Sequence, residues 1–270
     1  MLSDISKINL LANTLRFIKD PSVIVLHGAG VSVAAGIPDF RTPNTGFFSK
    51  LQKFNLKTPE EIFDINYFRD NPKPFYFIAS ELLPGKFKPT KAHFFSKLLD
   101  QKDILLRNYT QNIDGLERAT GISEEKIVEA HGHFRSSSCI RCGDEVPNQK
   151  VINSIKTKTP VYCECGGLAK PDIVFYGENL PWRFFRLSQT DFANCKCLIV
   201  IGTSLKVFPF ASLVDLVDKD VPRFLINNEK VGNFKYDKND FYIGGDCQNA
   251  IELLVHEIGW EDEFMKMLRI

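Results

Sequence analysis

The chain has 270 residues, of which 44% are hydrophobic and 25% are charged, and these values are ordinary for a globular protein. Lysine and arginine together number 34 against 33 aspartates and glutamates, so the formal net charge of +1 gives no global field to hold a polyphosphate backbone. No apolar run is long enough to span a bilayer. Composition therefore argues against a membrane protein and against nucleic acid as the main ligand.

The first twenty residues predict an amphipathic helix that caps the domain. Five apolar residues recur there at helical spacing: Ile5, Ile8, Leu11, Leu15 and Ile18. Charged residues between them interrupt the apolar stretch that a signal peptide requires. We therefore expect this segment to belong to the fold.

Seven short β-branched runs, separated by helix-like stretches, predict the strands. The runs are residues 22–28, 103–110, 126–132, 172–178, 197–203, 223–229 and 241–245. Continuous apolar strands of this kind indicate a buried, mostly parallel sheet with helices on both faces. We therefore predict an α/β fold with a Rossmann-like core. A final helix is expected to pack on the sheet through Ile251, Leu254, Val255 and Ile258.

Two stretches interrupt this rhythm and predict a second, smaller lobe. Residues 39–101 are rich in Phe, Pro and Lys, and residues 135–170 hold paired cysteines. We expect residues 1–38, 102–134 and 171–270 to form the Rossmann-like domain. The small lobe would then join a helical insertion, 39–101, to a zinc-ribbon insertion, 135–170.

The cysteines predict a metal site. There are seven, an odd number, and four of them form two close pairs: Cys139 with Cys142, and Cys163 with Cys165. Two such pairs about 20 residues apart are typical of a closed, tetrahedral zinc ribbon in a reducing compartment. We predict one structural zinc ion and a cytoplasmic or nuclear location. The second pair has one intervening residue in place of two, which leaves the zinc geometry open.

Residues 28–36, GAGVSVAAG, follow the first predicted strand and suggest a phosphate loop. Gly28 and Gly30 allow a tight turn and a close approach to a pyrophosphate at the start of the next helix. A plain strand-to-helix turn is an equal alternative, because the spacing departs from G-x-G-x-x-G. The loop continues directly into Asp39, Phe40 and Arg41, which a hydride-transferring dehydrogenase does not need there.

Polar side chains also follow the second predicted strand. Gln111, Asn112 and Asp114 lie on a short turn at its carboxyl end, where open α/β sheets bind ligands. A helix N-terminus, capped by Asn112 or Asp114, is an equal alternative for this segment.

A histidine that follows the third predicted strand is a candidate general base. His131 stands between an apolar strand and Gly132, so it is able to point from a rigid element into a cleft. A lone histidine is more often a structural residue, and His133 and His27 compete for the role.

Later strand ends carry further candidates for a nucleotide site. Thr203 and Ser204 are hydroxyl donors after one strand, and Glu229 is a ribose acceptor after the next. Taken alone, each of these segments is explained equally well as a simple turn. Asp246 is a candidate cap for the final helix, and Cys247 is equally explained by packing.

Taken in order, these blocks closely resemble the sirtuin family over about residues 20–250. They are GAGVSVAAGIPDFR, YTQNIDGLE, EAHGHF, the two cysteine pairs, KPDIVFYGE, GTSLKVFPFA, LINNE and GGDC. The resemblance is to the eukaryotic branch that contains cytoplasmic tubulin and histone deacetylases. It implies an enzyme that consumes NAD to remove acyl groups from lysine, with nicotinamide, O-acyl-ADP-ribose and free lysine as products. Its expected partners are acylated proteins of the histone or tubulin kind.

The resemblance also implies residue roles. His131 would be the general base and Asn112 a second catalytic residue. Around the NAD phosphates and nicotinamide ribose, it implies Ala29, Gly30, Asp39, Phe40 and Arg41. In the nicotinamide pocket, it implies Gln111, Asn112 and Asp114. At the adenosine half, it implies Gly202, Ser204, Asn227, Glu229 and Cys247. Val174, Phe175 and Gly177 would lie in the segment that pairs with the substrate peptide as an added strand.

Two features bear on the acyl group. Tyr176 replaces the commoner second Phe of the family's FFGE pattern. The Arg and Tyr pair that marks members preferring acidic acyl groups is not seen around Ala34 or residues 36–41. A simple acetyl or a longer fatty acyl group is therefore favoured.

The chemistry implied is attack of the acyl-lysine amide oxygen on the ribose C1′, in a site that excludes water. Neutral His131 would then accept a proton from a ribose hydroxyl. Three alternatives remain open from the sequence: a sirtuin-type mono-ADP-ribosyltransferase, a catalytically weak module that binds NAD and acyl-lysine, and a zinc-ribbon scaffold.

Overall fold

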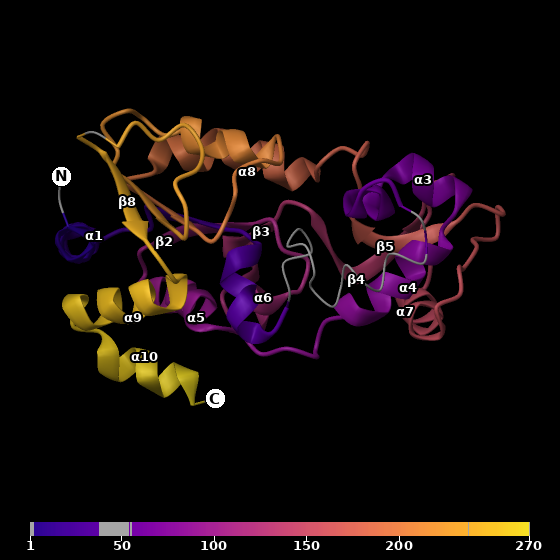
Figure 1. Cartoon of the computed structure of the whole chain (residues 1–270), viewed down its shortest axis with the longest axis horizontal. Helices are drawn as coiled ribbons and strands as arrows, with labels where there is room; N and C mark the ends of the chain where they lie inside the picture. Colours follow the sequence, from indigo (N-terminus) through magenta and orange to yellow (C-terminus); the bar gives the residue numbers. More distant parts are fainter. Residues whose placement is uncertain (1–2, 38–53, 55, 237, 270) are drawn as a thin grey trace.

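The computed structural model describes residues 3–37, 54, 56–236 and 238–269, and these form two lobes that lie side by side (Figure 1). The larger lobe contains a six-stranded sheet, and the smaller contains a two-stranded sheet. None of the helices in these ranges has both the length and the apolar composition that crossing a bilayer requires.

The large sheet is parallel throughout. Its strands are β1 (Val23–His27), β2 (Leu105–Thr110), β3 (Ile127–Glu129), β6 (Cys197–Ile201), β7 (Arg223–Asn227) and β8 (Asp240–Gly244). They lie in the order β3-β2-β1-β6-β7-β8, and every neighbouring pair is parallel. Numbered among themselves, these strands have the order 3-2-1-4-5-6 of doubly wound dinucleotide-binding sheets. The predicted Rossmann-like core is confirmed.

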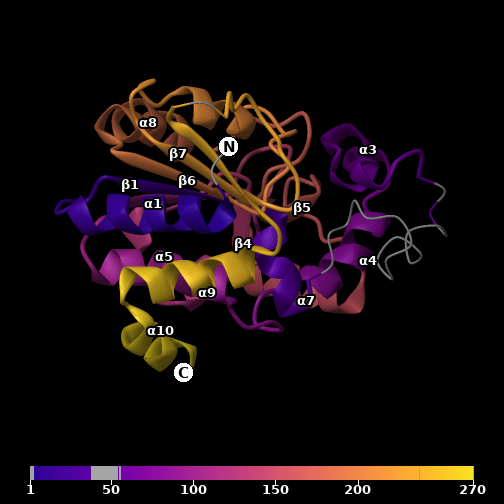
Figure 2. The ribbon, with the colours of Figure 1, turned by 60° about the vertical axis from the view of Figure 1, so that its left-hand side comes forward.

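Helices cover both faces of this sheet. Alternate residues of each strand point to opposite sides, so each strand contributes to the core on either face. Val23 and Val25 of β1 belong to the core under α1 (Asp4–Phe17), α5 (Lys91–Gln101), α9 (Cys247–Ile258) and α10 (Glu261–Leu268). Ile24 and Leu26 face the opposite core, under α8 (Trp182–Asp191), η5 (Phe192–Asn194) and η6 (Phe210–Asp215). Figure 2 shows α1, α5 and α9 on one side of the sheet and α8 on the other.

The N-terminal helix and the helix expected to be the last, α9, were predicted, but α10 follows α9, so α9 is not the final helix. In α1, Ile8, Leu11 and Leu15 are buried, but Ile5 is 66% exposed, because the helix begins at Asp4 and its first turn projects beyond the core. All four predicted apolar residues of α9 are buried. The Asp246 carboxylate accepts hydrogen bonds from two amides of the first turn of α9, as a capping residue does.

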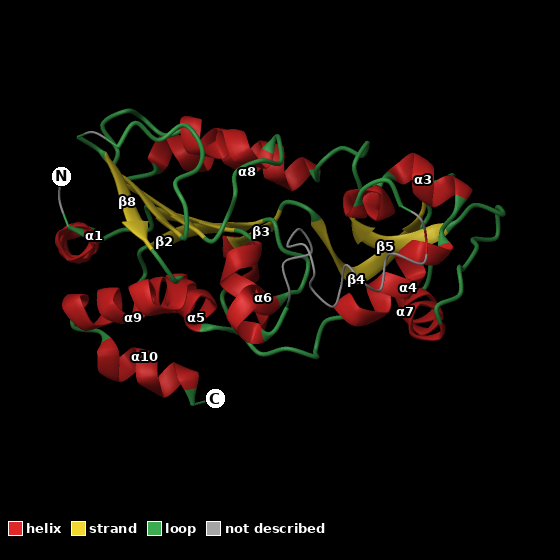
Figure 3. Ribbon diagram, viewed as in Figure 1, coloured by secondary structure: helices red, strands yellow, loops and turns green. Residues whose placement is uncertain are grey.

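The small lobe has one apolar core to which both insertions contribute. Strands β4 (Gly132–Cys139) and β5 (Ala169–Ile173) pair antiparallel (Figure 3). The helical elements are η3 (Pro59–Phe63), α3 (Ile65–Asp70), α4 (Lys73–Leu82) and α7 (Asn148–Thr157). Phe75 and Tyr76 of α4 pack in the same cluster as Val151 and Ile155 of α7. The Tyr76 hydroxyl donates a hydrogen bond to the carbonyl oxygen of Ala169, 2.5 Å away.

Two expectations about the division between the lobes need correction. The run 172–178 is not a strand of the parallel sheet, because its first residues pair with β4 and the rest turns into the small lobe. Helix α5 lies inside the expected insertion 39–101, but its buried face packs in the core of the large sheet. Its packing places the end of the helical insertion before Lys91.

The remaining short elements connect these layers. They are η1 (Ala29–Ala35), α6 (Leu116–Ala119) and η4 (Glu124–Lys126). Residues 29–35 of the glycine-loop block themselves form the 3-10 helix η1, where the sequence suggested a loop followed by the start of an ordinary helix. Asp39, Phe40 and Arg41, which were predicted next to this loop, lie outside the described residues.

Candidate functional site

The glycine loop crosses the end of β6 at the point where the strand order reverses. The Gly30 amide donates to the carbonyl oxygen of Gly202, 2.8 Å away. A Cβ atom added at Gly28 would lie 2.5 Å from Cβ of Thr203, and one added at Gly30 would lie 2.8 Å from Cα of Gly202. Two backbones in such close contact require glycine. The switch point of an open α/β sheet is where ligands bind, so this crossing marks the candidate site.

A hydrogen-bonded chain ties the glycine loop to the polar turn after β2. The side-chain amide of Asn112 donates to the carbonyl oxygen of Gly28 (3.1 Å) and to Oγ of Ser32 (3.2 Å). The Ser32 hydroxyl donates to Oδ2 of Asp114, 2.7 Å away. The other oxygen of Asp114 accepts from the amide of Leu116 at the start of α6. Asp114 thus bonds the first turn of α6, whose N-cap residue is Gly115, and also contacts the glycine loop.

Asp114 is a carboxyl group with altered acidity. Its burial raises the pKa to about 6, and the nearby negative charge of Glu117 acts in the same direction. Hydrogen bonds from Leu116 and Ser32 oppose this shift. A carboxyl group that titrates near neutral pH at a strand end is typical of a functional site.

Gln111 links the turn to the opposite side of the site. Its side-chain amide donates to Oγ1 of Thr203, 2.7 Å away, and its backbone amide donates to the carbonyl oxygen of His27. These hydrogen bonds therefore join the carboxyl ends of β1, β2 and β6. Of the predicted nucleotide-binding residues, this group includes Gly28, Gly30, Gln111, Asn112, Asp114, Gly202 and Thr203.

His131 lies beside this group, and its ring orientation is fixed. Its Nδ1 atom is 2.9 Å from the carbonyl oxygen of Gln111. Because a carbonyl oxygen only accepts, Nδ1 carries the proton and Nε2 is the basic nitrogen. The next residue, Gly132, has a φ of +76°, and a Cβ there would lie 1.9 Å from the carbonyl oxygen of Asp172. Only glycine fits this turn, which lies between His131 and the rest of β4.

The two competing histidines are placed differently. His27 is completely buried, and this burial lowers its pKa to about 3. His133 lies on β4, and burial together with the charge of Arg135 lowers its pKa. The ring of His131 bonds the polar turn through the Gln111 carbonyl, whereas His27 meets that turn through its backbone carbonyl oxygen.

The adenosine side of the predicted site is assembled in part. The Cys247 thiol donates to the carbonyl oxygen of Gly30, 3.7 Å away, and burial raises the pKa of this thiol to about 11. The side-chain amide of Asn227 donates to the carbonyl oxygen of Glu229, and the side chain of Glu229 is exposed. Ala29 is exposed and Ser204 is partly buried at the same edge of the sheet.

The predicted substrate segment contains Val174, Phe175 and Gly177, and the backbone amides of Val174 and Phe175 are hydrogen-bonded within the chain. The Phe175 ring is buried, with its centroid 4.9 Å from that of Phe75 and 5.3 Å from that of Phe68. The Val174 amide donates to the carbonyl oxygen of His131, so this segment is joined directly to the candidate base. Gly177 is exposed, with a φ of +91°.

The four paired thiols form a compact cluster in the small lobe. The sulfur atoms of Cys139, Cys142, Cys163 and Cys165 all lie within 4.8 Å of one another. Two of the separations are 3.5 Å, for Cys139 with Cys165, and 3.8 Å, for Cys142 with Cys163. Four thiolates at about 2.3 Å from a central zinc ion would lie about 3.8 Å apart, so the cluster fits that ion despite the short second pair.

The sequence pattern of the Sir2 family matches residues 28–209, more than half of the chain. The chain belongs to the Sir2 family. It is 46% identical over 259 residues to the NAD-dependent protein deacetylase hst2 of Schizosaccharomyces pombe, covering 96% of this chain and 78% of that protein. It is 45% identical over 262 residues to mouse NAD-dependent protein deacetylase sirtuin-3, with the same coverage of 96% and 78%.

A longer relative of the Sir2 family is the NAD-dependent deacetylase sir2A of Dictyostelium discoideum. It is 49% identical over 272 residues, which cover 96% of this chain. The chain spans only 53% of that protein's length, about half.

Several residues of this Sir2 site were not predicted. Ser32 stands within the glycine-loop block but was given no role, and it bonds both Asn112 and Asp114. Gln248, next to Cys247, donates from its side-chain amide to the carbonyl oxygen of Val31. Gln248 is a polar residue on the apolar face of a predicted helix, and this position could have identified it as a candidate site residue.

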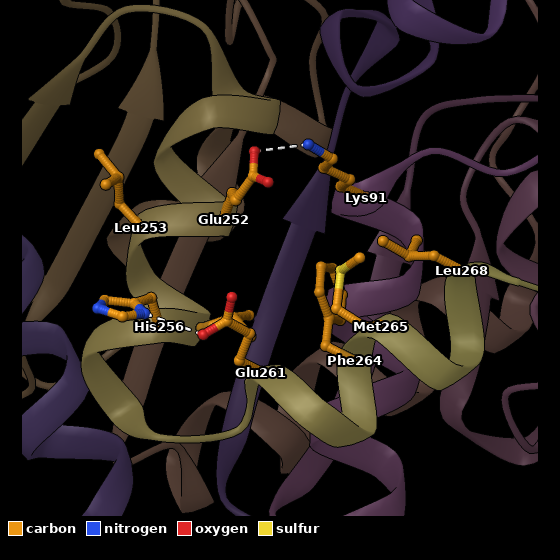
Figure 4. Close-up of a pocket in the computed structure, with 9 residues that line it drawn as sticks. Lys91, Glu252, Leu253, His256, Glu261, Phe264, Met265 and Leu268 are labelled. Atoms are coloured by element: carbon orange, nitrogen blue, oxygen red, sulfur yellow. Dashed lines mark hydrogen bonds and ion pairs between the residues drawn. The ribbon is translucent and has the colours of Figure 1, made fainter.

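A pocket of this Sir2 chain lies outside the candidate site. It has a volume of about 170 Å³ and is lined by Lys91 together with residues of α9 and α10 (Figure 4). Lys91 pairs with Glu252 at 2.6 Å, and His256 pairs with Glu261 at 3.0 Å. No residue predicted for NAD, substrate or metal lines it.

Proposed function

We propose that this chain is an NAD-dependent protein-lysine deacylase that produces nicotinamide, O-acyl-ADP-ribose and free lysine. The observation that carries this proposal is the contact between His131 and the polar turn at the switch point of the sheet. The names of its Sir2 relatives, which are NAD-dependent deacetylases, support deacylation over ADP-ribosyl transfer to protein.

NAD would bind across the carboxyl ends of β1, β2 and β6. We propose that the pyrophosphate lies at the glycine loop, beside the close crossing of Gly28 and Gly30 with Gly202, because ligands of open α/β sheets bind at this switch point. Gln111, Asn112 and Asp114 would surround the nicotinamide. At the adenosine half we propose Thr203, Ser204, Asn227, Glu229 and Cys247, and near the phosphates Ala29, with Asp39, Phe40 and Arg41 of the same sequence block.

NAD supplies a ribose carbon that the acyl-lysine oxygen attacks, and the protein positions the groups and moves the proton. Nε2 of His131 would accept a proton from a ribose hydroxyl, because the Gln111 carbonyl holds the proton on Nδ1. Asn112 would hold the glycine loop and the nicotinamide turn together through its bonds to Gly28 and Ser32.

The acylated substrate would lie along residues 174–177, between the strands of the large lobe and those of the small lobe. We propose that its backbone adds to this segment as a strand, as the resemblance to sirtuins implies. Acylated proteins of the histone or tubulin kind are the proposed substrates, with acetyl or longer fatty acyl groups. A cytoplasmic or nuclear location is proposed from the seven unpaired cysteines.

The four thiols of the small lobe would hold one zinc ion. Such a site has no open coordination position, so its role would be to join β4 and the segment before β5. Residues 1–38, 102–134 and the part of 171–270 that follows the run 172–178 would form the NAD-binding domain with α5. The two insertions and residues 172–178 would form the substrate-side lobe.

The test is a product analysis. The chain is incubated with NAD and an acetylated peptide, and the products are separated by mass spectrometry. We expect one nicotinamide and one acetyl-ADP-ribose for each lysine freed. Acetyl release without NAD would refute the proposal, and ADP-ribose attached to protein in place of acetyl-ADP-ribose would indicate transferase activity.

A further inference from the structure

The side chain of Gln248 is buried at a point where three elements of the large lobe meet. Gln248 is the second residue of α9 and is 8% exposed. Its side chain reaches the glycine loop in η1 on one side and the first turn of α5 on the other. Glutamine is mostly found at the surface, and a buried amide is costly unless it is hydrogen-bonded. The partners of this side chain therefore indicate what it does.

Gln248 makes a bridge between the glycine loop and helix α5. Its Nε2 atom donates to the carbonyl oxygen of Val31 at 3.1 Å and to Sγ of Cys247 at 3.4 Å. Its Oε1 atom accepts from the backbone amide of Ala92 at 3.0 Å. A carbonyl only accepts and a backbone amide only donates, so these two partners fix the orientation of the side-chain amide. Donor and acceptor are both used, one toward each element.

The carbonyl group that Gln248 holds belongs to a fully buried residue, Val31. The Thr90 hydroxyl also donates to this oxygen, at 2.8 Å. The same hydroxyl lies 2.8 Å from Nδ1 of His93, which accepts from the Thr90 amide at 3.1 Å. A hydroxyl has one proton for these two acceptors, whereas the side-chain amide of Gln248 has two protons and serves both of its acceptors at once. Without Gln248, the carbonyl would be left with one shared donor.

This carbonyl lies in the middle of the glycine loop. On one side of Val31, the Gly30 amide donates to the carbonyl oxygen of Gly202 at the crossing with β6. On the other side, the Ser32 hydroxyl donates to the carboxylate of Asp114 in the polar turn. Hydrogen bonds in a 3-10 helix have poorer geometry than those of an α-helix, so η1 depends on such outside contacts for its shape. The bridge is attached between the two points where the loop meets the candidate site.

We propose that Gln248 is a positioning residue: it holds the glycine loop in the shape that binds NAD by tying the Val31 carbonyl to the first turn of α5. The inference rests on the proposed function, because it requires NAD to bind at this loop. Gln248 acts through the loop, since its side chain bonds protein groups. When only a fraction of the molecules has the loop in its binding shape, the measured Kd rises by the inverse of that fraction.

The first experiment uses Gln248→Met, which keeps the length of the side chain and removes both of its bonds to backbone. We expect the Kd for NAD, measured by calorimetric titration, to rise about three- to tenfold, the range that loss of one buried hydrogen bond gives. The KM for NAD should rise with it. At saturating NAD the loop is held by the ligand, so kcat and the KM for acyl-peptide should stay near the wild type.

Asn249→Ala is the matched control, because Asn249 is the next residue of α9 and its side chain is exposed. This variant should leave the Kd and both KM values unchanged. A wild-type Kd for NAD in folded Gln248→Met would overturn the proposal. Equal increases in the KM of NAD and of acyl-peptide would also overturn it, because they would indicate a general loss of structure.

A second measurement uses the wild type alone. The Ala92 amide is in the first turn of α5, where amides have no partner within the helix, so its hydrogen exchange reports on the bond to Gln248. Coupling between sites is reciprocal, so NAD should slow exchange at Ala92 if the bridge favours NAD binding. The Asn249 amide, which donates to the Asp246 carboxylate, corrects for overall stabilisation of the fold.

Exchange is followed by NMR with and without NAD. An Ala92 amide that NAD slows no more than the Asn249 amide would refute the positioning role, even if the enzyme deacylates. A wild type that binds NAD and slows Ala92 but frees no lysine would refute only the proposed function. A wild type that does not bind NAD would refute both.

Discussion

The Nδ1 atom of His131 lies 2.9 Å from the backbone carbonyl oxygen of Gln111. The carbonyl is itself held in place, because the amide of Gln111 donates to the carbonyl oxygen of His27 at the end of β1. The tautomer of the candidate base is thus set by backbone geometry at the edge of the sheet, and Nε2 is the nitrogen able to accept a proton.

The first prediction separates the two steps of the proposed reaction. The amide oxygen that attacks the ribose has no proton to lose, so His131 is needed only afterwards. His131→Ala should abolish formation of free lysine, while labelled nicotinamide should still exchange into NAD when acyl-peptide is present. Lysine release and exchange are measured on the same preparation.

The matched control for that experiment is His133→Ala. His133 is two residues away on β4, and within the described part of the chain no hydrogen bond joins its side chain to the polar turn, so its loss should cost far less activity. Normal deacylation by His131→Ala together with failure of His133→Ala would mean that the base is misassigned. Full activity of both variants would exclude the proposed proton relay.

The second prediction concerns the thiol cluster. Cys163→Ser replaces a sulfur that lies 3.8 Å from that of Cys142. The variant should bind less than the expected zinc content of about one ion per chain, and its small lobe should be less stable. Zinc content is measured by atomic emission. Cys195→Ser is the control, since Cys195 is buried among residues of the large lobe. Zinc loss in the control alone would refute the ligand assignment.

The third prediction concerns a buried ion pair beside the substrate segment. The Lys170 ammonium lies 3.0 Å from Oε2 of Glu178 and donates to the carbonyl oxygen of Ile173, while the same Glu178 oxygen accepts from the Phe175 amide. Burial lowers the pKa of Lys170, and the charge of Glu178 opposes that shift. This pair therefore fixes the turn that residues 174–177 make as they leave β5.

Removal of the lysine should loosen that turn. Lys170→Met is expected to lower the free energy of unfolding by about 2 kcal/mol, less than for a fully buried pair because Glu178 is partly exposed. The KM for acyl-peptide should rise more than kcat falls, whereas Lys170→Arg should stay near the wild type. A KM unchanged in folded Lys170→Met would show that the pair does not position the substrate segment.

The sheet was predictable because its strands have a local signature, and the small lobe was predictable only in outline. A continuous apolar run is enough to predict β1 or β6. The run at 172–178 has the same composition, but its partners are β4 and the aromatic core around Phe75, which are distant in sequence. Local propensity does not distinguish the two environments.

The site was predictable in its residue types more than in its connections. The sequence offered two roles for Asp114, a helix cap and a ligand contact. In the structure one carboxylate oxygen accepts from the Leu116 amide in the first turn of α6, whose N-cap is Gly115, and the other accepts from the Ser32 hydroxyl of the glycine loop. The pairing of His27 with Glu117 joins residues 90 positions apart. No spacing rule predicts such a pair, because it depends on which faces of β1 and α6 meet.

The last prediction concerns stability against acid and uses the buried histidines. Burial lowers the pKa of His27 to about 3 and that of His93 to about 4, from an ordinary value of 6.5. Below pH 6.5 the unfolded chain protonates both rings and the folded chain does not, so the free energy of unfolding falls as pH decreases toward 4. Each ring contributes a slope of about 1.4 kcal/mol per pH unit in that window. Asp114 acts oppositely, because its pKa is raised to about 6 and the folded chain binds its proton first.

His27→Asn removes one of these titrations and keeps a donor for Glu117. Between about pH 6 and pH 5 its free energy of unfolding should therefore depend less steeply on pH than that of the wild type, by roughly 1.4 kcal/mol per unit. Urea unfolding at several pH values measures this slope. His256→Gln is the control: His256 is exposed, and Glu261 raises its pKa, so this histidine stabilises the fold at low pH. Its loss should leave the slope unchanged or make it steeper. A His27→Asn slope equal to that of the wild type would mean that His27 is protonated in the folded chain.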